Sequence, residues 1–199
     1  IEASDVHKRL ELTKGQYILL SAHREENIDT DCNFLQLFTA VNAMAERYDM
    51  PILYSCHPRS RKRLEATGFR LDSRVIAHEP LGFHDYNCLQ MNAFAVVSDS
   101  GTLPEESGFF LSIGKPFPAI SIRTSTERPE ALDAGCFVLA GIDTESLLQG
   151  VEMAVQMQQE GCFGTPVADY TGENVSMKAA RLIQSYTGVV NKMVWRKGR

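Results

Sequence analysis

The sequence predicts an α/β protein whose core is a doubly wound parallel sheet. Short apolar runs of strand length alternate with longer helical patterns along most of the chain, which is typical of consecutive βαβ units with right-handed crossovers. Several of these runs lead directly into polar loops that carry serine, glycine and charged side chains. Because ligands in such sheets bind beyond the carboxyl ends of the strands, these loops are where a functional site is expected.

The composition is that of an ordinary globular protein. The 199 residues are 44% hydrophobic and 23% charged, close to the averages for soluble domains. A net charge of -5 argues against a nucleic-acid partner, which would require a basic face. No apolar run approaches the roughly 18 residues of a membrane span, and no signal-peptide pattern is present. We therefore expect a cytoplasmic protein without a membrane partner.

The cysteines give no sign of a metal or disulfide framework. They are five in number, widely spaced and without a CxxC pair, so neither a zinc ribbon nor a redox motif is predicted. We expect reduced, mostly buried thiols and no metal site.

The first half of the chain is predicted to hold strands at residues 17–22, 51–55 and 74–77, and helices at 33–48, 59–65 and 81–91. Residues 17–22 are apolar almost without a break, as in a strand covered on both faces. In residues 33–48 the apolar side chains recur at intervals of three and four, which makes one helical stripe. The basic stretch at 59–65 predicts a short solvated helix, for which Gly68 is a suitable C-cap.

The second half is predicted to hold strands at 94–97, 118–122 and 136–139, and helices at 104–110, 144–158 and 175–194. The last helix has a broad apolar face, and residues 161–169 before it resemble a linker. We therefore divide the chain into a Rossmann-like domain at 1–165 and a C-terminal helical segment at 166–199.

Polar side chains follow the first and fourth predicted strands. His23 and Arg24 come directly after the first, where they either face a phosphate or exchange a proton, or belong to an ordinary charged loop. Ser100, Gly101 and Thr102 follow the fourth strand and precede a helix, whose N-terminal N–H groups and dipole favour an anion. The sequence lacks both the GxGxxG fingerprint and a Walker A loop, so neither a nicotinamide cofactor nor ATP is predicted.

Two glutamates, one arginine and one histidine each admit two interpretations. Glu105 and Glu106 in the first turn of the helix either stabilise its dipole or, more specifically, bind ribose hydroxyls. Arg128 either clamps a phosphate or pairs with a neighbouring glutamate, Glu127 or Glu130. His57 is expected to be a buried, hydrogen-bonded histidine rather than a metal ligand, because no other His or Cys stands at ligand spacing.

Taken together, these motifs resemble a known family. Residues 23–27 (His-Arg-Glu-Glu-Asn), 98–102 (Ser-Asp-Ser-Gly-Thr) and 126–131 (Thr-Glu-Arg-Pro-Glu-Ala) resemble the non-hydrolysing UDP-N-acetylglucosamine 2-epimerases in order and spacing. Residues 82–87 and 89–93, with Thr102 in place of a second glycine, resemble the branch that acts on UDP-2-acetamido-2,6-dideoxy-L-talose.

The resemblance covers the carboxyl half of a two-domain enzyme of the glycosyltransferase-B type. It implies C2 inversion of a UDP-N-acetylhexosamine by elimination and re-addition of UDP, without a cofactor, in a bacterial pathway to capsule, O-antigen or another surface polysaccharide. It further implies an absent N-terminal domain of the same polypeptide, onto which the last helix crosses, and a homodimer of the full-length enzyme. This chain alone is then expected to bind UDP without catalysing the reaction.

The resemblance also assigns roles to individual residues. His23 is the catalytic residue beside the diphosphate. The implied UDP-binding residues are Ser100, Gly101 and Thr102 for phosphate, Glu106 for ribose, Arg128 for the diphosphate region and Tyr86 near uracil. Arg24 and His57 match a regulatory UDP-sugar site, although Glu25 stands where the main branch has a second arginine.

Two other functions remain open from the sequence. A glycosyltransferase of the same two-domain type, or a hydrolysing epimerase, would share the phosphate-binding helix and the ribose carboxylate. A stand-alone nucleotide-binding or regulatory module would share them without catalysis.

Overall fold

The chain folds around one parallel sheet of six strands in the order β3-β2-β1-β4-β5-β6. A computed structural model describes residues 1–197; positions 198 and 199 of the predicted C-terminal segment lie outside the described residues. The strands are β1 (Ile18–Ser21), β2 (Ile52–Ser55), β3 (Val75–His78), β4 (Ala95–Ser98), β5 (Ala119–Ser121) and β6 (Val138–Leu139). All six predicted strands are present, and the doubly wound parallel fold is confirmed.

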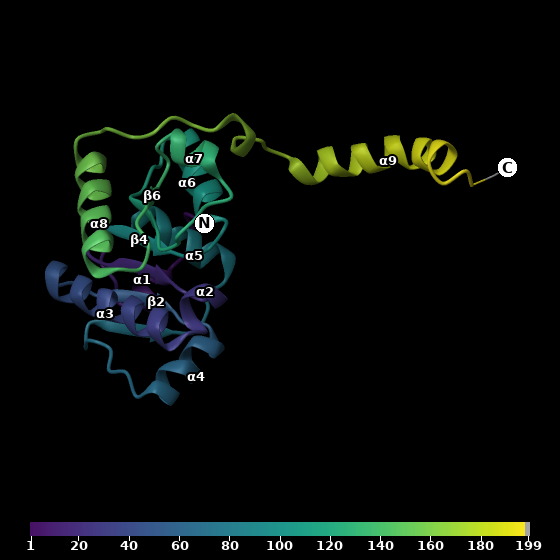
Figure 1. Ribbon diagram of the computed structural model, residues 1–199. Coiled ribbons are helices and arrows are strands. Elements are labelled where there is room, and N and C mark those ends of the chain that lie inside the picture. The colour runs from purple at the N-terminus through teal and green to yellow at the C-terminus, as the bar shows by residue number, and fades with distance from the viewer. Residues whose placement is uncertain (198–199) are drawn as a thin grey trace.

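Helices cover both faces of the sheet (Figure 1). They are α1 (Val6–Arg9), α2 (Glu25–Ile28), α3 (Asp31–Tyr48), α4 (Pro58–Thr67), α5 (Phe83–Asn92), α6 (Leu103–Ser112), α7 (Pro129–Asp133), α8 (Thr144–Gln159) and α9 (Val175–Met193), with a 3-10 turn η1 (Ala168–Tyr170). The six predicted helices are present within a few residues of their expected ends. Gly68 is the C-cap of α4 with φ of 64°, as predicted.

The two faces of the sheet carry separate apolar cores. Side chains alternate along β1, so that Ile18 and Leu20 pack with α3 and α8, whereas Leu19 packs with α1, α5, α6 and α7. This period of two follows from the pleat of a strand. Because both faces are covered, the strand reads as a continuous apolar run in the sequence.

The predicted linker is partly packed against the body. Thr165 donates its N–H to the Ala134 carbonyl at 2.8 Å, and a Cβ on Gly164 would lie 2.4 Å from that same oxygen. The η1 turn contacts α6, and the Tyr170 hydroxyl donates to the Glu130 carboxylate. Packing on the body therefore continues to Tyr170, and the predicted division at residue 165 stays a prediction.

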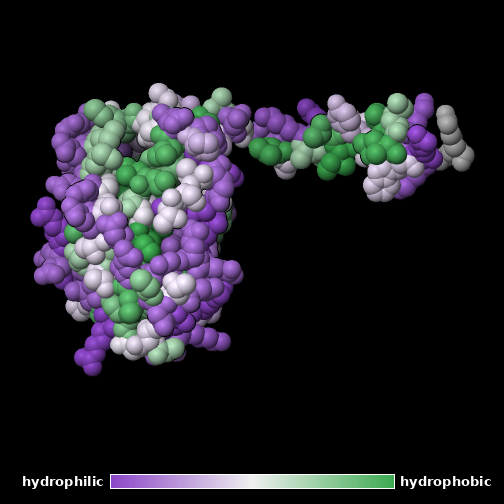
Figure 2. All heavy atoms as spheres, viewed as in Figure 1, coloured by the Kyte–Doolittle hydropathy of each residue, from purple (hydrophilic) through white to green (hydrophobic). Residues whose placement is uncertain are grey.

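The last helix, α9, extends away from the sheet and its flanking helices (Figure 1). None of its residues is buried. Apolar side chains run along it in Figure 2, and those more than half exposed are Val175, Met177, Leu182, Ile183, Tyr186, Val189 and Met193. In this structure the apolar face of α9 has no covering element among the described residues.

Candidate functional site

The polar loops predicted from the sequence meet at the carboxyl edge of the sheet. β1 and β4 are adjacent and parallel, and the chain leaves β1 toward β2 but leaves β4 toward β5. This reversal of strand order is the switch point at which doubly wound sheets bind ligands. The loops that follow β1, β4 and β5 all lie at this edge of the sheet.

Asp99 ties these loops together. Its side chain is fully buried, and one carboxylate oxygen accepts the N–H groups of His23 at 2.9 Å and Arg24 at 2.8 Å. The Asn27 amide donates to the same oxygen at 3.1 Å and to the Ile122 carbonyl at 3.0 Å. Burying a carboxylate is unfavourable unless it accepts hydrogen bonds, and this one receives several from the loop after β1. The sequence analysis missed this role of Asp99.

The imidazole of His23 is held by contacts at Nδ1, while nearly half of the side chain is exposed to solvent. Its Nδ1 lies 3.3 Å from a carboxylate oxygen of Asp99 and 3.5 Å from the Ser21 hydroxyl, while 45% of the side chain is exposed. A proton on Nδ1 facing the carboxylate leaves the lone pair on Nε2. The arrangement thus orients an imidazole that is able to exchange a proton on its exposed side.

Arg24 lies across the loop that follows β4. Its Nε donates to the Asp99 carbonyl at 3.1 Å, and a Cβ added to Gly101 would lie only 2.9 Å from its Nη2. The guanidinium of Arg24 therefore fits at this position because Gly101 has no side chain. Arg24, predicted as a regulatory residue, stands directly beside the predicted phosphate-binding residues.

The start of α6 carries a chain of hydroxyl and carboxylate groups. The Ser100 and Thr102 hydroxyls are 3.0 Å apart, and Thr102 donates to one oxygen of Glu106 at 3.0 Å. Gln90 on α5 donates its amide to the other oxygen of Glu106 at 2.7 Å. The chain enters α6 through Thr102 without a side-chain cap. The Leu103 N–H donates to the Ser100 carbonyl at 3.3 Å and Pro104 has no N–H, so an anion at this helix start would meet the N–H groups of Gly101 and Glu105.

Arg128 pairs with a carboxylate that the sequence analysis did not consider as its partner. Its Nε and Nη2 lie 2.7 and 2.6 Å from one oxygen of Glu105. Its Nη1 donates to the backbone carbonyl of Glu127 at 3.1 Å, and its ion pair is with Glu105 rather than with the carboxylate of Glu127 or Glu130. The pair is about one third exposed on each side, so both groups remain accessible from the solvent.

Glu127 is occupied by another arginine, Arg123, which sequence reasoning missed. Both Nη atoms of Arg123 bind the Glu127 carboxylate, at 2.5 and 2.8 Å, and its Nε binds Glu26 at 3.2 Å. Only 6% of the Arg123 side chain is exposed. Its guanidinium lowers the pKa of Glu127 to about 2, and the Glu127 carboxylate raises the pKa of Arg123.

The loops after β1, β4 and β5 enclose one open pocket of about 750 Å³. Its lining residues are His23, Arg24, Glu25, Arg59, Ser100, Gly101, Thr102, Glu105, Glu127 and Arg128. Six of them (His23, Arg24, Ser100, Gly101, Thr102 and Arg128) belong to the predicted site residues, which the structure therefore brings together. Arg59 enters the pocket from α4 and pairs with Glu25 at 3.2 Å and with Asp29 at 2.7 Å.

Tyr86 and Glu106 do not line this pocket, but Glu106 accepts a hydrogen bond from Thr102, which does. Tyr86 on α5 is half-buried. Burial raises the pKa of its hydroxyl, and the neighbouring Glu106 carboxylate raises it further. The two residues predicted for ribose and uracil are thus neighbours.

The expectation of a buried His57 is wrong. His57 is exposed because it is the N-cap of α4, where its Nδ1 accepts the Arg59 N–H at 3.3 Å. A capping side chain has to stay at the helix end and so does not pack into the core. The expected hydrogen bond is present, and His57 does not line the pocket.

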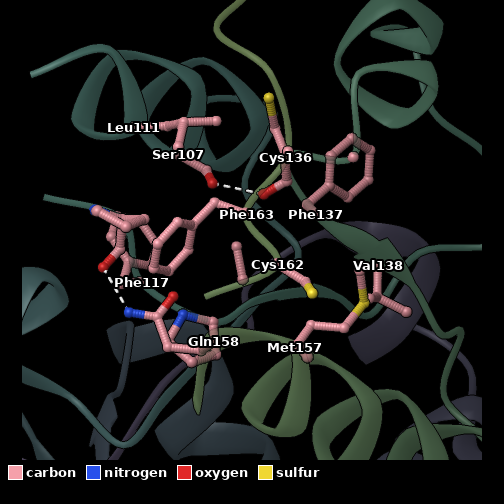
Figure 3. A pocket seen from close by; sticks show the side chains of 16 residues that line it. Ser107, Leu111, Phe117, Cys136, Phe137, Val138, Met157, Gln158, Cys162 and Phe163 are labelled. Carbon is pink, nitrogen blue, oxygen red and sulfur yellow. Dashed lines mark hydrogen bonds between the residues drawn. The ribbon is translucent and has the colours of Figure 1, made fainter. Parts of the chain in front are cut away.

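A second cavity, of about 50 Å³, lies between α6, α8 and the start of β6 (Figure 3). Its walls are mostly apolar, with the Ser107 hydroxyl donating to the Cys136 carbonyl at 2.5 Å and the Gln158 amide to the Pro116 carbonyl at 3.0 Å. Its polar groups are already paired, so it offers little chemistry.

Within residues 1–197 the structure holds no cluster of three or more His, Cys, Asp or Glu side chains suited to a metal ion. No helix in the same part of the chain has the length and apolarity to cross a membrane. The thiols are free, with Cys56, Cys88 and Cys136 buried and Cys32 and Cys162 exposed, as expected for mostly buried reduced cysteines.

The sheet order and the polar pocket at its switch point define a Rossmann-like α/β domain. The family model described as UDP-N-acetylglucosamine 2-epimerase matches residues 1–184. The chain belongs to the UDP-N-acetylglucosamine 2-epimerase family, in agreement with the resemblance found in the sequence.

Individual relatives agree with this assignment. The UDP-N-acetylglucosamine 2-epimerase of Methanococcus maripaludis is 35% identical over 163 residues, which are 79% of this chain and 43% of the relative. The structure of the Rickettsia bellii enzyme of that name matches with a TM-score of 0.81 and 34% identity, covering 98% of this chain and 51% of that one. A Methanocaldococcus jannaschii enzyme in complex with UDP-GlcNAc and UDP matches with a TM-score of 0.74 and 27% identity, covering 90% and 49%. The chain thus spans about half the length of its relatives.

Proposed function

We propose that this chain is the UDP-binding half of a UDP-N-acetylhexosamine 2-epimerase. The observation that carries the proposal is the pocket at the switch point, where the open start of α6, the oriented His23 and two arginines converge. A pyrophosphate requires such a combination of helix N–H groups and cationic side chains. The family membership and the relative in complex with UDP-GlcNAc and UDP support the same ligand.

In this proposal the diphosphate binds at the start of α6. The hydroxyl groups of Ser100 and Thr102, with the backbone N–H of Gly101, would donate to phosphate oxygens, because the N–H groups of Ser100 and Thr102 are already bound to the Ser98 and Ser100 hydroxyls. Arg128, directly before α7, would contribute one charge and the nearby Arg24 a second. Because Arg128 is held by Glu105 in this structure, its guanidinium is placed at the rim before the ligand arrives.

Glu106 and Tyr86 form the nucleoside side of the proposed site. Glu106 would accept hydrogen bonds from the ribose hydroxyls, and the ring of Tyr86 would lie near uracil. The hydrogen bond from Thr102 to Glu106 and the proximity of Glu106 to Tyr86 support this order, because in a nucleoside diphosphate the sugar adjoins the phosphates and the base lies beyond it.

The reaction proposed for the whole enzyme is an elimination followed by an addition. A base removes the C2 proton, the C2–H electrons form the C1=C2 double bond, and the C1–O bond breaks with its electrons leaving on UDP. UDP then adds back to C1 while a proton reaches the opposite face of C2. In this step His23 would carry a proton on Nε2 as well as on Nδ1 and would donate the Nε2–H to the departing diphosphate oxygen, with Asp99 holding the Nδ1–H side of the imidazole.

The C2 base is expected from a second, N-terminal domain of the same polypeptide. The exposed apolar face of α9 supports this part of the proposal, since a face of that size is normally covered by another element. We further propose that the full-length enzyme is a cytoplasmic homodimer that supplies surface-polysaccharide precursors, and that Arg24 and His57 respond to a second UDP-sugar.

The proposal is tested by two measurements. The 199-residue chain should bind UDP in a calorimetric titration. The full-length enzyme should incorporate deuterium at C2 of a UDP-N-acetylhexosamine in deuterated water, as followed by NMR. A full-length protein that transfers the sugar or releases free UDP without C2 exchange would instead support the transferase or hydrolase.

A further inference from the structure

Gln90 on α5 is a buried polar residue whose side-chain amide has a hydrogen-bond partner for its nitrogen but none for its oxygen among the described residues. The side chain is fully buried, and its Nε2 donates to a Glu106 oxygen at 2.7 Å. Its Oε1 has no hydrogen-bond partner among residues 1–197. An ionised carboxylate only accepts hydrogen bonds, so the amide nitrogen has to face Glu106 and the unsatisfied oxygen follows from that orientation.

The carboxylate of Glu106 is held from two sides. Gln90 binds one oxygen, and the Thr102 hydroxyl binds the other at 3.0 Å. Each carboxylate oxygen accepts a second hydrogen bond. Two acceptor positions therefore remain side by side, in a plane that is fixed before any ligand binds, and this is the pattern that a vicinal diol requires.

The two partners of Glu106 differ in how easily they are replaced. Thr102 is exposed, so water is able to take over its hydrogen bond. Gln90 lies in the interior, where no water competes, so losing its amide leaves that carboxylate oxygen free to turn. At the same time the unsatisfied Oε1 of Gln90 lowers the stability of the fold, since a buried acceptor without a donor is unfavourable.

We infer that Gln90 is a positioning residue that orients the Glu106 carboxylate for the vicinal hydroxyls of a ribose. The inference rests on the proposed UDP site and names the part of the ligand that Gln90 controls. It predicts an unusual combination. Replacing Gln90 by the apolar isostere methionine should weaken recognition of the ribose while leaving the stability of the chain equal or higher.

The experiment compares UDP with 2′,3′-dideoxy-UDP in calorimetric titrations of the 199-residue chain. The wild type should prefer UDP by about tenfold, the size of a lost charge-assisted hydrogen bond. In Gln90→Met the affinity for UDP should fall by about tenfold. The affinity for dideoxy-UDP should stay the same, so the preference disappears.

A matched control is available on the same helix. The Asn92 amide donates to the Cys88 carbonyl at 2.7 Å and has no contact with Glu106. Asn92→Leu removes a similar amide and should retain the full preference for UDP. The urea midpoint of each variant shows whether the fold is intact.

A double variant separates positioning from general packing. If Gln90 acts through Glu106, adding Gln90→Met to Glu106→Gln should change the preference no further. Gln90→Leu provides a second substitution in case the methionine variant misfolds, and it should also abolish the preference, since leucine has no donor for Glu106.

The outcomes separate this inference from the proposed function. A folded Gln90→Met or Gln90→Leu variant that keeps the wild-type preference overturns the role of Gln90, while leaving the UDP site standing. A wild-type chain that binds neither nucleotide contradicts the proposed site itself, and the inference falls with it.

Discussion

The carboxylate of Asp99 lies against His23, with one oxygen 2.9 Å from its backbone N–H and the other 3.3 Å from its Nδ1. A single buried side chain after β4 thus fixes both the position and the ring orientation of the proposed catalytic residue after β1. The proposed role of His23 depends on this relationship, because an imidazole assists a leaving group only when its free nitrogen faces the reacting atoms.

Replacing Asp99 by asparagine should destabilise the chain. The asparagine amide nitrogen would face donors that now bind a carboxylate oxygen, and the buried charge would be lost. We expect about 2–4 kcal/mol of lost unfolding free energy, measured by urea denaturation. Asp133→Asn, which changes an exposed carboxylate of α7, serves as the control and should change the unfolding free energy little.

Replacing His23 by asparagine in the full-length enzyme should lower turnover far more than it weakens UDP binding. General acid–base assistance contributes about 10²–10⁴-fold, whereas one neutral hydrogen bond contributes about 1 kcal/mol. Steady-state kinetics and a UDP titration of the same variant give the two numbers. Unchanged turnover combined with a large loss of UDP affinity would assign His23 to binding only.

Replacing Gly101 by alanine should displace the guanidinium of Arg24. The new Cβ would lie 2.9 Å from Nη2, which is the mobile end of a long side chain, so the fold should be little affected. UDP affinity should fall by about tenfold through loss of one charge-assisted contact. Gly82→Ala, where a Cβ would meet no atom within 4 Å, is the control. Equal UDP affinities for the two variants would remove Arg24 from the site.

The pair of Arg123 and Glu127 should make stability depend on pH in the acid range. Arg123 lowers the pKa of Glu127 to about 2 from a usual value of 4.5. The pair therefore stabilises the folded chain fully above about pH 4.5, and this contribution is lost as the pH falls toward 2. Glu127→Gln should reduce the change in urea midpoint between pH 5 and about pH 2.5. Glu173→Gln, which lies outside the pair, should leave that change as in the wild type. An identical slope for wild type and Glu127→Gln would show that the pair does not control acid stability.

The sequence predicted the sheet and the polar loops at its carboxyl edge because both depend on local patterns. A strand buried on both faces is a run of apolar residues, and the polar loops that follow β1 and β4 are visible without any three-dimensional information. The short helices α1, α2 and α7 span four or five residues, too few to show a helical period, and were not predicted.

The specific pairings at the site were harder to predict because they join distant segments. Asp99 binds N–H groups 75 and 76 residues earlier in the chain, and Arg128 pairs with Glu105 on α6 rather than with its sequence neighbours. His57 was expected in the interior, but it is the N-cap of α4 and is exposed. Each of these outcomes depends on which loops meet at the edge of the sheet.

The central claim is that the 199-residue chain alone forms a UDP site, and an isothermal titration with UDP tests it most directly. We predict saturable binding of one UDP per chain, with an affinity in roughly the micromolar-to-millimolar range because water screens the open pocket. A wild-type chain that gives no binding heat at millimolar UDP, while its urea transition shows that it is folded, would contradict the claim.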